Sequence, residues 1–327
     1  MNIAVDAMGG DYAPEVVVRG AAEACEDLNC NIILVGDSKA ISSCLRNNYS
    51  ETGITIHHCC DVIGMDESPM KALRNKKDSS IQIAFDLMKR GKADAVVSAG
   101  NSGAAMAAAI LSSGKLETVE RPALACILPG VKGDVILIDV GGNVDCRPTH
   151  LLQFGIMAEA FAVSCLKMNN PRIGILNIGE EPGKGNELVK TAYELYSRSR
   201  LNFTGNIEGR DVLTGDVQII VCDGFTGNIV LKFSEGMAES LSSRLLNGLR
   251  NEPLDAKDRD FLKEFEESLD YAEYGGAPIL GINGIGIVCH GHSSFRAIKN
   301  AIKMAYNYVE NRTGEKLLKR LQDYRQN

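Results

Sequence analysis

The sequence predicts an α/β protein with a doubly wound, mostly parallel β-sheet. Apolar runs of strand length alternate with helical patterns along most of the 327 residues. Several runs, such as Val135–Ile138, are apolar at every position, which is typical of strands buried on both faces of a parallel sheet. Strands that alternate with helices indicate right-handed βαβ units.

Each expected element follows from its residue pattern. Pro14 opens the first helix at an early helical position, and residues 80–90 place Ile81, Phe85 and Met88 on one face. The expected strands are 2–6, 31–36, 54–57, 95–98, 123–128, 135–139, 172–176 and 217–222. The expected helices are 14–28, 80–90, 150–168, 187–200 and 294–311, with a charged cap at 314–327. We expect the whole chain, 1–327, to form a single two-lobed α/β domain.

A protruding helical hairpin is expected at 234–271, as an insertion within that domain. Its first arm is 234–250, and a second arm follows at 258–271 beyond a turn that contains Pro253. The apolar stripes are Met237, Leu241, Leu245 and Leu249 on the first arm, and Phe261, Leu262, Phe265 and Leu269 on the second. Such stripes indicate either packing against the body or a second subunit, or contact with a membrane surface or another partner.

Composition and charge limit the classes of function. Apolar residues make up 45% and charged residues 24% of the chain, as in ordinary soluble proteins, and the net charge is −7. An acidic chain without tryptophan is not expected to bind nucleic acid. No apolar run approaches the ~20 residues that span a bilayer, and the start does not read as a signal peptide, so a cytoplasmic protein is expected. The ten cysteines include no Cys-x-x-Cys pair and are expected to be reduced.

Five turns rich in glycine and asparagine are the strongest indication of a functional site. Each follows a short apolar strand, and they lie at 98–104, 139–145, 177–186, 222–228 and 281–286. Glycine allows positive φ and lets a ligand approach bare backbone N–H groups, and ligands of open α/β sheets bind beyond the carboxyl ends of strands. We therefore expect the five turns to gather at one edge of the sheet and to form a pocket for an anion.

Familiar nucleotide and catalytic motifs do not occur in these turns. Residues 6–11, at the end of the first strand, do not match the Gly-x-Gly-x-x-Gly fingerprint. A P-loop does not fit, because three residues separate Gly179 from Gly183 and Gly185 follows the lysine. Neither His-Glu-x-x-His nor Gly-x-Ser-x-Gly is present, so no metal site and no serine nucleophile is expected.

Lys184 is the candidate cation of the anion pocket. It lies between Gly183 and Gly185, and Asn186 has the residue type of an N-cap for the next helix. A cation flanked by glycines at a helix N-terminus suits an anion site, although a solvated loop lysine fits the same pattern.

A second concentration of positive charge precedes the helix at 80–90. Lys71, Arg74, Lys76 and Lys77 fall within seven positions of a chain whose net charge is −7. Such a segment is either a patch that attracts an acidic ligand or protein, or a solvated charged turn.

Seven segments together resemble the bacterial phosphate acyltransferase family. They are 6–11 with Ala13 and Pro14, 98–104, 177–181, 184–188, 205–210, 223–228 (Asp-Gly-Phe-Thr-Gly-Asn) and 274–278, and they follow one order along the chain. The resemblance implies a fold like that of the isocitrate and isopropylmalate dehydrogenases and phosphotransacetylase. It also implies a cytosolic homodimer that works near the membrane and transfers a fatty acyl group from acyl carrier protein to inorganic phosphate. The product would be acyl phosphate for phospholipid synthesis.

For that reaction, Lys184 is expected to neutralise phosphate or the oxyanion, and Asn228 to orient the reactants. The other residues expected to bind phosphate or the oxyanion are Gly100, Asn101, Ser102, Gly103, Gly141, Asn143, Gly183, Gly185, Asn186 and Gly227. The basic segment would contact the carrier protein or phosphate, and no cofactor or metal is needed. A membrane surface or a downstream glycerol-3-phosphate acyltransferase is a further partner to consider. The family more often has serine at Cys289, and serine or alanine at His292, so no role is assigned to these two or to His290.

Two other functions fit parts of the pattern. A metal- and NAD-dependent decarboxylating dehydrogenase on the related fold would need clustered aspartates and a nucleotide pocket. The chain has aspartates at strand ends but no nucleotide fingerprint. A non-catalytic scaffold at a membrane surface would use the hairpin, and it predicts liposome binding that does not depend on Lys184.

Overall fold

A continuous eleven-stranded sheet runs through the molecule in the computed structural model, which describes residues 1–46, 52–249 and 275–325. The strand order is β3-β2-β1-β4-β11-β10-β5-β6-β9-β7-β8, and seven of the ten pairings are parallel. The predicted α/β class and mostly parallel sheet are therefore confirmed. The strands are β1 (Asn2–Asp6), β2 (Asn31–Gly36), β3 (Ile54–His58), β4 (Ala95–Ser98), β5 (Ala123–Leu128), β6 (Val135–Ile138), β7 (Ile173–Asn177), β8 (Phe203–Glu208), β9 (Ile219–Val221), β10 (Ala277–Leu280) and β11 (Gly286–Val288).

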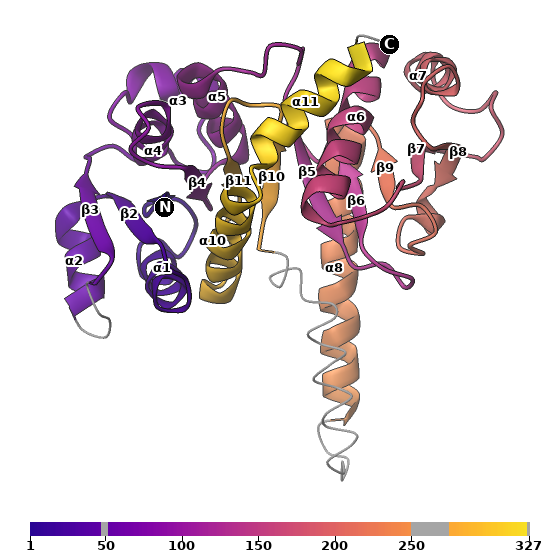
Figure 1. Cartoon of the computed structure of the whole chain (residues 1–327). Helices are drawn as coiled ribbons and strands as arrows, with labels where there is room; N and C mark the ends of the chain where they lie inside the picture. The colour runs from indigo at the N-terminus through magenta and orange to yellow at the C-terminus, as the bar shows by residue number, and fades with distance from the viewer. Residues whose placement is uncertain (47–51, 250–274, 326–327) are drawn as a thin grey trace.

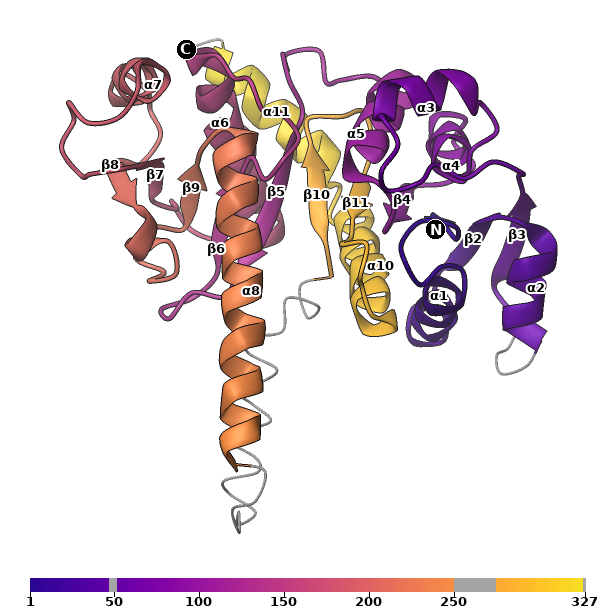
Figure 2. The same cartoon turned by 180° about the vertical axis from the view of Figure 1, so that it is seen from behind.

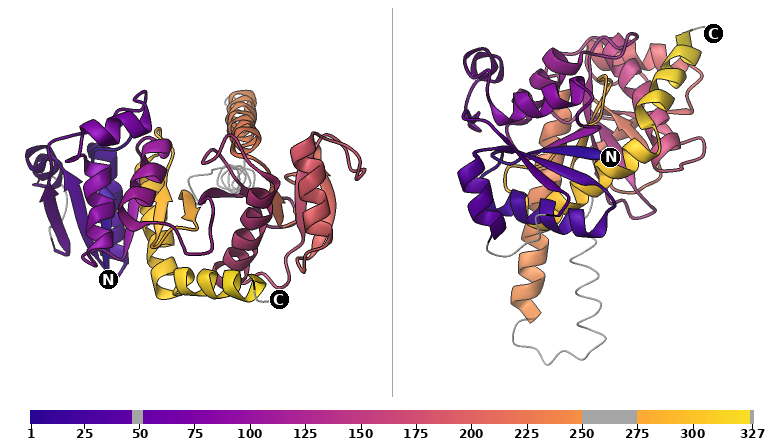
Figure 3. Two further views of the ribbon diagram at one scale, coloured as in Figure 1. Left: turned by 90° about the horizontal axis from the view of Figure 1, so that it is seen from above. Right: turned by 60° about the vertical axis from the view of Figure 1, so that its left-hand side comes forward.

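Helices cover both faces of this sheet (Figures 1 and 2). One face carries α1 (Glu15–Asp27), α2 (Ser38–Arg46), α6 (Pro148–Cys165), α7 (Glu187–Ser197), α10 (Phe295–Glu310) and α11 (Thr313–Arg325). The other carries α3 (Pro69–Asn75), α4 (Ser80–Lys89), α5 (Ser102–Ser113) and the start of α8 (Gly224–Leu249). Seen from above, α11 and α8 lie on opposite sides of the molecule (Figure 3). The apolar strands bury both faces: on β6, Ile136 and Ile138 join one cluster and Leu137 joins the other.

Three strands were not predicted, and each has a physical reason. β8 is an edge strand of mixed polarity with Gly205 inside it, so it lacks the apolar run that marks a central strand. β10 contains Pro278, which argues against a strand, and β11 has only three residues. Tertiary pairing of these short segments with β4 and β5 overrides their weak local signal.

The antiparallel pairings divide the sheet into two sets of strands that run in opposite directions. β10 is antiparallel to both β11 and β5, and β5 is antiparallel to β6. The carboxyl ends of β6, β7, β9 and β10 therefore meet at one edge, and those of β1, β4 and β11 at the other. The prediction that all five glycine turns share one edge is wrong: 98–104 lies opposite the other four. Direction was misjudged because an apolar run does not reveal which way its strand points.

α8 contains the first arm of the predicted hairpin and projects beyond the sheet (Figure 1). Its 26 residues span about 39 Å at 1.5 Å per residue. One side of α8 exposes an apolar stripe at intervals of four residues, formed by Phe225, Ile229, Phe233, Met237 and Leu241. The predicted second arm, 258–271, lies outside the described residues.

Candidate active site

A cavity of about 470 Å³ lies between α8, the N-terminus of α5 and strands β5, β10 and β11. Its size falls within the range of about 300–1,000 Å³ that is usual for ligand pockets. Much of the wall is apolar, and the lining includes Met65, Leu124, Cys126, Ile127, Val140, Leu231 and Val288. Polar and charged side chains gather in the same cavity, namely Asp11, Ser102, Asn228, Lys232, Glu235, His290 and His292. The cavity therefore combines an apolar wall with polar and charged groups.

Several polar and charged groups of the cavity lie on one side of α8. Asn228, Lys232 and Glu235 recur at i, i+4 and i+7, which places them on one side of the helix. The Lys232 ammonium lies 2.9 Å from Glu235 Oε2 and also contacts Nε2 of His290, which follows β11. Burial and the neighbouring Lys232 ammonium lower the pKa of His290, so its imidazole is neutral near pH 7. The carboxylate of Asp11 lies 2.7 Å from His292 Nδ1 at the same end of the cavity.

Two cysteines in the cavity wall are not suited to nucleophilic chemistry. Burial raises the pKa of the Cys126 thiol and of the Cys289 thiol to about 12. A thiol with such a pKa is almost entirely protonated at neutral pH, and the protonated form is a poor nucleophile. An acyl-cysteine intermediate on either residue is therefore disfavoured.

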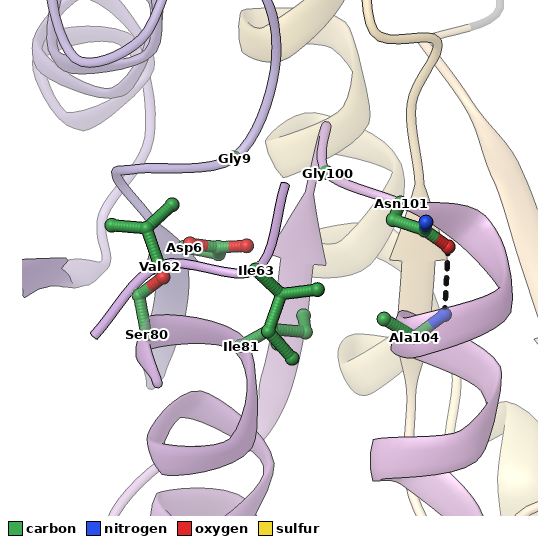
Figure 4. A pocket seen from close by; sticks show the side chains of 9 residues that line it. All are labelled: Asp6, Gly9, Val62, Ile63, Ser80, Ile81, Gly100, Asn101 and Ala104. Carbon is green, nitrogen blue, oxygen red and sulfur yellow. Dashed lines mark hydrogen bonds between the residues drawn. The ribbon is translucent and has the colours of Figure 1, made fainter. Parts of the chain in front are cut away.

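A buried carboxylate, Asp6, connects the loop after β1 to the loop between β4 and α5 (Figure 4). Its Oδ2 accepts a hydrogen bond of 2.7 Å from Ser98 Oγ, which itself accepts one from the Gly100 N–H at 3.1 Å. A Cβ on Gly9 would lie 2.6 Å from Asp6 Oδ2 and 2.7 Å from the Gly100 nitrogen, so only glycine permits this contact. Burial raises the pKa of Asp6, while its hydrogen bonds oppose that rise. Asp6 therefore fixes the loop that leads into α5.

A second buried carboxylate, Asp139, has the same role in the other half. Its Oδ1 accepts from the Leu124 and Gly142 N–H groups, each at 3.0 Å, and its Oδ2 accepts from Asn143 Nδ2 at 2.8 Å. Burial raises the pKa of this carboxyl, against the effect of these hydrogen bonds. The turns at 139–145 and 222–228 pack closely here, since a Cβ on Gly227 would lie 1.9 Å from the Asp139 carbonyl oxygen. Asp139 therefore sets where α8 begins, and with it the position of Asn228.

Asn101 has a structural role in the described chain. Its Oδ1 caps α5 by accepting from the Ala104 N–H at 3.0 Å (Figure 4). Its Nδ2 donates to the carbonyl oxygens of Met65 and Glu67 at 2.9 and 3.2 Å. The two bonds from Nδ2 hold the 62–67 loop, whose Met65 lines the cavity, against the start of α5.

Replacing Asn101 by aspartate is expected to separate these two functions. Aspartate keeps the cap but cannot donate to the two carbonyl groups, whereas alanine loses both. We expect Asn101→Asp to lower the free energy of unfolding by about 1 kcal/mol and Asn101→Ala by about 2–3 kcal/mol. Urea unfolding of the two variants measures the difference, and equal losses would contradict the donor role.

The structure brings some of the predicted site residues together and separates others. Gly100, Ser102 and Asn228 line the cavity, and a Cβ on Gly141 would lie 3.7 Å from Asn228. Gly103 provides close packing of α5 against Pro69, and Asn143 is buried with its amide bonded to Asp139 and to the Pro122 carbonyl. In this single chain, Lys184 and its neighbours Gly183, Gly185 and Asn186 lie on the β7–α7 loop and do not line the cavity.

The β7–α7 loop has the local structure that the sequence predicts. Asn186 caps α7 by accepting from the Val189 N–H at 3.0 Å, which confirms its predicted capping role. Gly185 has φ of +91°, and a Cβ there would lie 2.4 Å from Asn177 Oδ1. Lys184 is exposed, two strands from β6 on the edge that carries the 139–145 turn.

The basic segment divides in a similar way. Lys76 Nζ contacts Glu67 and the Val62 carbonyl oxygen, so it braces the loop beside the cavity. Lys71, Arg74 and Lys77 are exposed on and just after α3.

Lys232 and His290 are the cavity residues to which sequence reasoning gave no role. A signal for Lys232 was available: it stands four residues after Asn228, on the helix that follows a glycine turn. Nothing in the sequence marks His290 as its neighbour, because β11 and α8 meet only through the fold.

Two features are absent from the described residues. No group of three or more His, Cys, Asp or Glu side chains in this part of the chain is placed to share a metal ion. Among the helices of residues 1–46, 52–249 and 275–325, none is both long and apolar enough to span a bilayer.

The fold is that of the phosphotransacylases. A phosphotransacetylase from Streptococcus pyogenes superimposes with a TM-score of 0.66 at 16% identity, over 95% of this chain and 94% of that one. A branched-chain phosphotransacylase from Enterococcus faecalis gives 0.57 at 14% identity, over 94% and 99%. The 4-hydroxythreonine-4-phosphate dehydrogenase of Klebsiella pneumoniae gives 0.55 at 13% identity, over 94% and 99%. Identities this low show the fold alone, and they confirm the predicted dehydrogenase-like architecture.

Sequence comparison shows the family. The family described as "Fatty acid synthesis protein" matches residues 1–316. Proteins called phosphate acyltransferase from Lawsonia intracellularis and Nitratidesulfovibrio vulgaris are 50% and 49% identical, each over 97% of this chain and over 94% and 93% of their own. The chain belongs to this family and is an acyltransferase, which confirms the resemblance seen in the sequence.

Proposed function

We propose that this chain transfers a fatty acyl group from the thioester of acyl carrier protein to inorganic phosphate. The observation that carries the proposal is the single cavity in which an apolar wall adjoins Ser102, Asn228, Lys232 and His290. The apolar wall suits an acyl chain, and the polar groups suit the reacting carbonyl. Family membership and the name of its relatives support phosphate as the acceptor. The acyl phosphate product would serve phospholipid synthesis.

The chemistry asks mainly for positioning and control of charge. Phosphate is a largely ionised nucleophile near neutral pH, and a thiol with a pKa of about 8.5 is a good leaving group. Orientation of two bound reactants can supply up to about 7–11 kcal/mol of the barrier reduction. Donors placed at the tetrahedral oxyanion add about 2.7–4 kcal/mol each. Neither a metal ion nor a redox cofactor has a step to perform in this scheme.

The turns supply the groups for this positioning. Ser102, at the N-terminus of α5, and Asn228, one turn into α8, line the cavity and would orient the carbonyl and phosphate. We place phosphate on the side of Asn228 that meets Gly141, because the turn that contains Gly141 lies at the same edge of the sheet as the loop of Lys184. Lys184 would draw phosphate to that edge.

The test of the proposed function is phosphate-dependent release of thiol. Long-chain acyl carrier protein incubated with the chain should release free thiol only when phosphate is present. Release at the same rate without phosphate would identify a thioesterase instead. No release under either condition would contradict an acyltransferase acting on this donor.

Lys184→Ala should weaken the use of phosphate. Loss of an exposed cation beside the phosphate path is expected to raise the KM for phosphate at least tenfold, with a smaller effect on the KM for the acyl donor. Initial rates at varied phosphate concentration measure this change, and Lys190→Ala, on the following helix, is the matched control. An unchanged KM for phosphate would remove Lys184 from the site.

The exposed cations of α3 are proposed to receive the acidic carrier protein. Replacing Lys71, Arg74 and Lys77 together by glutamate should raise the KM for acyl carrier protein by about tenfold or more at low salt, and by less as salt increases. The KM for phosphate should change little. Lys76 is left intact because it braces the loop beside the cavity. A triple variant whose KM for acyl carrier protein equals that of the parent protein at every salt concentration would contradict the docking role.

The apolar stripe of α8 supports a homodimer. Five exposed large apolar side chains along one side of a projecting helix form a surface that a second copy would cover. We propose that the protein is a cytoplasmic homodimer and that each copy folds as one two-lobed domain. The hairpin at 234–271 would contact a membrane surface. Phe233→Glu should shift the mass measured by light scattering from dimer to monomer, and an unchanged mass would contradict this interface.

A further inference from the structure

We infer that Lys232 is the catalytic cation that faces the departing sulfur, and that His290 and Glu235 position its ammonium. The inference rests on the proposed acyl transfer and adds the residue that handles the leaving group.

The first argument is location. Of the described residues that line the cavity, Lys232 alone carries a lysine or arginine side chain. Its side chain is 47% exposed and has the open cavity in front of it. It lies one helical turn beyond Asn228, so a carbonyl oriented by Asn228 would bring its bond to sulfur within reach of the ammonium.

The second argument is that the ammonium is held from two sides. Glu235, whose side chain is 15% exposed, contacts it from the same helix at 2.9 Å, and His290 contacts it from the end of β11. The backbone N–H of His292 lies 3.2 Å from the other ring nitrogen of His290. A neutral imidazole accepts at one nitrogen only, and Nε2 accepts from the ammonium in the tautomer that carries the ring proton on Nδ1. His290 therefore orients Lys232 without adding a second positive charge.

The third argument is the charge that surrounds the pair. Among the described residues, Asp11 from the β1–α1 loop and Glu235 from α8 are carboxylates that face His290, and His292 and Lys232 are titratable groups beside it. These carboxylates make this end unfavourable for a second anion such as phosphate, so phosphate and thiolate are expected at different ends of the cavity. An ammonium between a carboxylate and a neutral ring suits a charge that develops only during the reaction.

The step balances without any further reactant. An oxygen of hydrogen phosphate forms a bond to the thioester carbon, and the carbon–sulfur bond breaks with its electron pair on sulfur. Lys232 gives one proton to that thiolate and is reprotonated from solvent, to which the remaining P–OH of the acyl phosphate gives up its proton. The products are the thiol and the acyl phosphate dianion, and Lys232 ends as it began.

Lys232→Gln tests the assignment through the acidity of the leaving thiol. We expect kcat for a long-chain acyl thioester of an alkyl thiol to fall about 10²–10³-fold. For the same acyl group on an acidic aryl thiol, which leaves without help, the fall should be about tenfold or less. The KM for phosphate should stay within about threefold of that of the parent enzyme, which separates Lys232 from Lys184.

Three further variants make the result specific. Lys232→Arg keeps the charge but cannot give up a proton, so it should restore only part of the alkyl thioester rate that Lys232→Gln loses. Lys232→Met is a second neutral variant with good helix propensity, for use if the glutamine variant does not fold. Arg244→Gln removes an exposed cation further along the same helix and should change neither rate. Unchanged kcat, or equal losses for both thioesters, in a folded Lys232→Gln or Lys232→Met variant would overturn the assignment. A parent enzyme without phosphate-dependent thiol release would instead refute the proposed function.

Discussion

Replacing Gly227 by alanine is expected to abolish acyl transfer and to lower the free energy of unfolding by about 3 kcal/mol or more. A Cβ at this position would lie 1.9 Å from the carbonyl oxygen of Asp139 and 2.9 Å from Cys222 Sγ. The oxygen belongs to the backbone and cannot rotate away, so the start of α8 must shift. Because a misplacement of about 1 Å at a reacting group can cost 10²-fold in rate, displacement of Asn228 and Lys232 should remove most activity.

Gly236 offers a matched control on the same helix. A Cβ there meets nothing within 4 Å, so Gly236→Ala should retain activity and add about 0.4–1 kcal/mol of stability. Chemical unfolding and steady-state rates of the two variants give the comparison. A Gly227→Ala protein with parental stability and turnover would show that α8 does not need this contact.

The second large effect is expected for Asp139→Ala, which should cost about 3–5 kcal/mol of stability and most of the activity. The substitution leaves the Leu124 and Gly142 N–H groups and the Asn143 amide without the acceptor that they have now. Each unsatisfied buried donor costs about 1–3 kcal/mol. Both turns that border the cavity should loosen as a result.

Two controls separate this effect from the loss of any carboxylate. Asp139→Asn keeps an oxygen for the two backbone donors but turns an amide toward Asn143, so an intermediate loss is expected. Asp216→Ala removes an exposed carboxylate paired with Lys132 and should cost no more than about 1 kcal/mol. Equal stability of Asp139→Ala and Asp216→Ala would contradict the organising role of Asp139.

Much of the fold was predictable because its signals are local. Runs such as Val135–Ile138 have few alternatives to a strand buried on both faces. All eight expected strands occur, four with the expected bounds and four with shifted ends. Strand direction is not local: the antiparallel pairings of β5 and β10 depend on partners far away in the chain. That is why the turn at 98–104 was placed on the wrong edge.

The candidate site was predictable only in part, for the same reason. Asn228 and Ser102 sit at helix starts beside glycine turns, which a sequence can reveal. Asn101 and Lys76 looked equally suited to a ligand, but they hold the 62–67 loop through partners that only the fold brings near. Lys232 gained its meaning from His290, which is 58 residues away in the chain.

The most direct test of the account is the identity of the product. The chain, long-chain acyl carrier protein and phosphate should yield acyl phosphate, detected by mass spectrometry or trapped with hydroxylamine, in equal amount to the free thiol. Formation of free fatty acid in place of acyl phosphate, with hydroxylamine unable to trap an acyl group, would contradict transfer to phosphate.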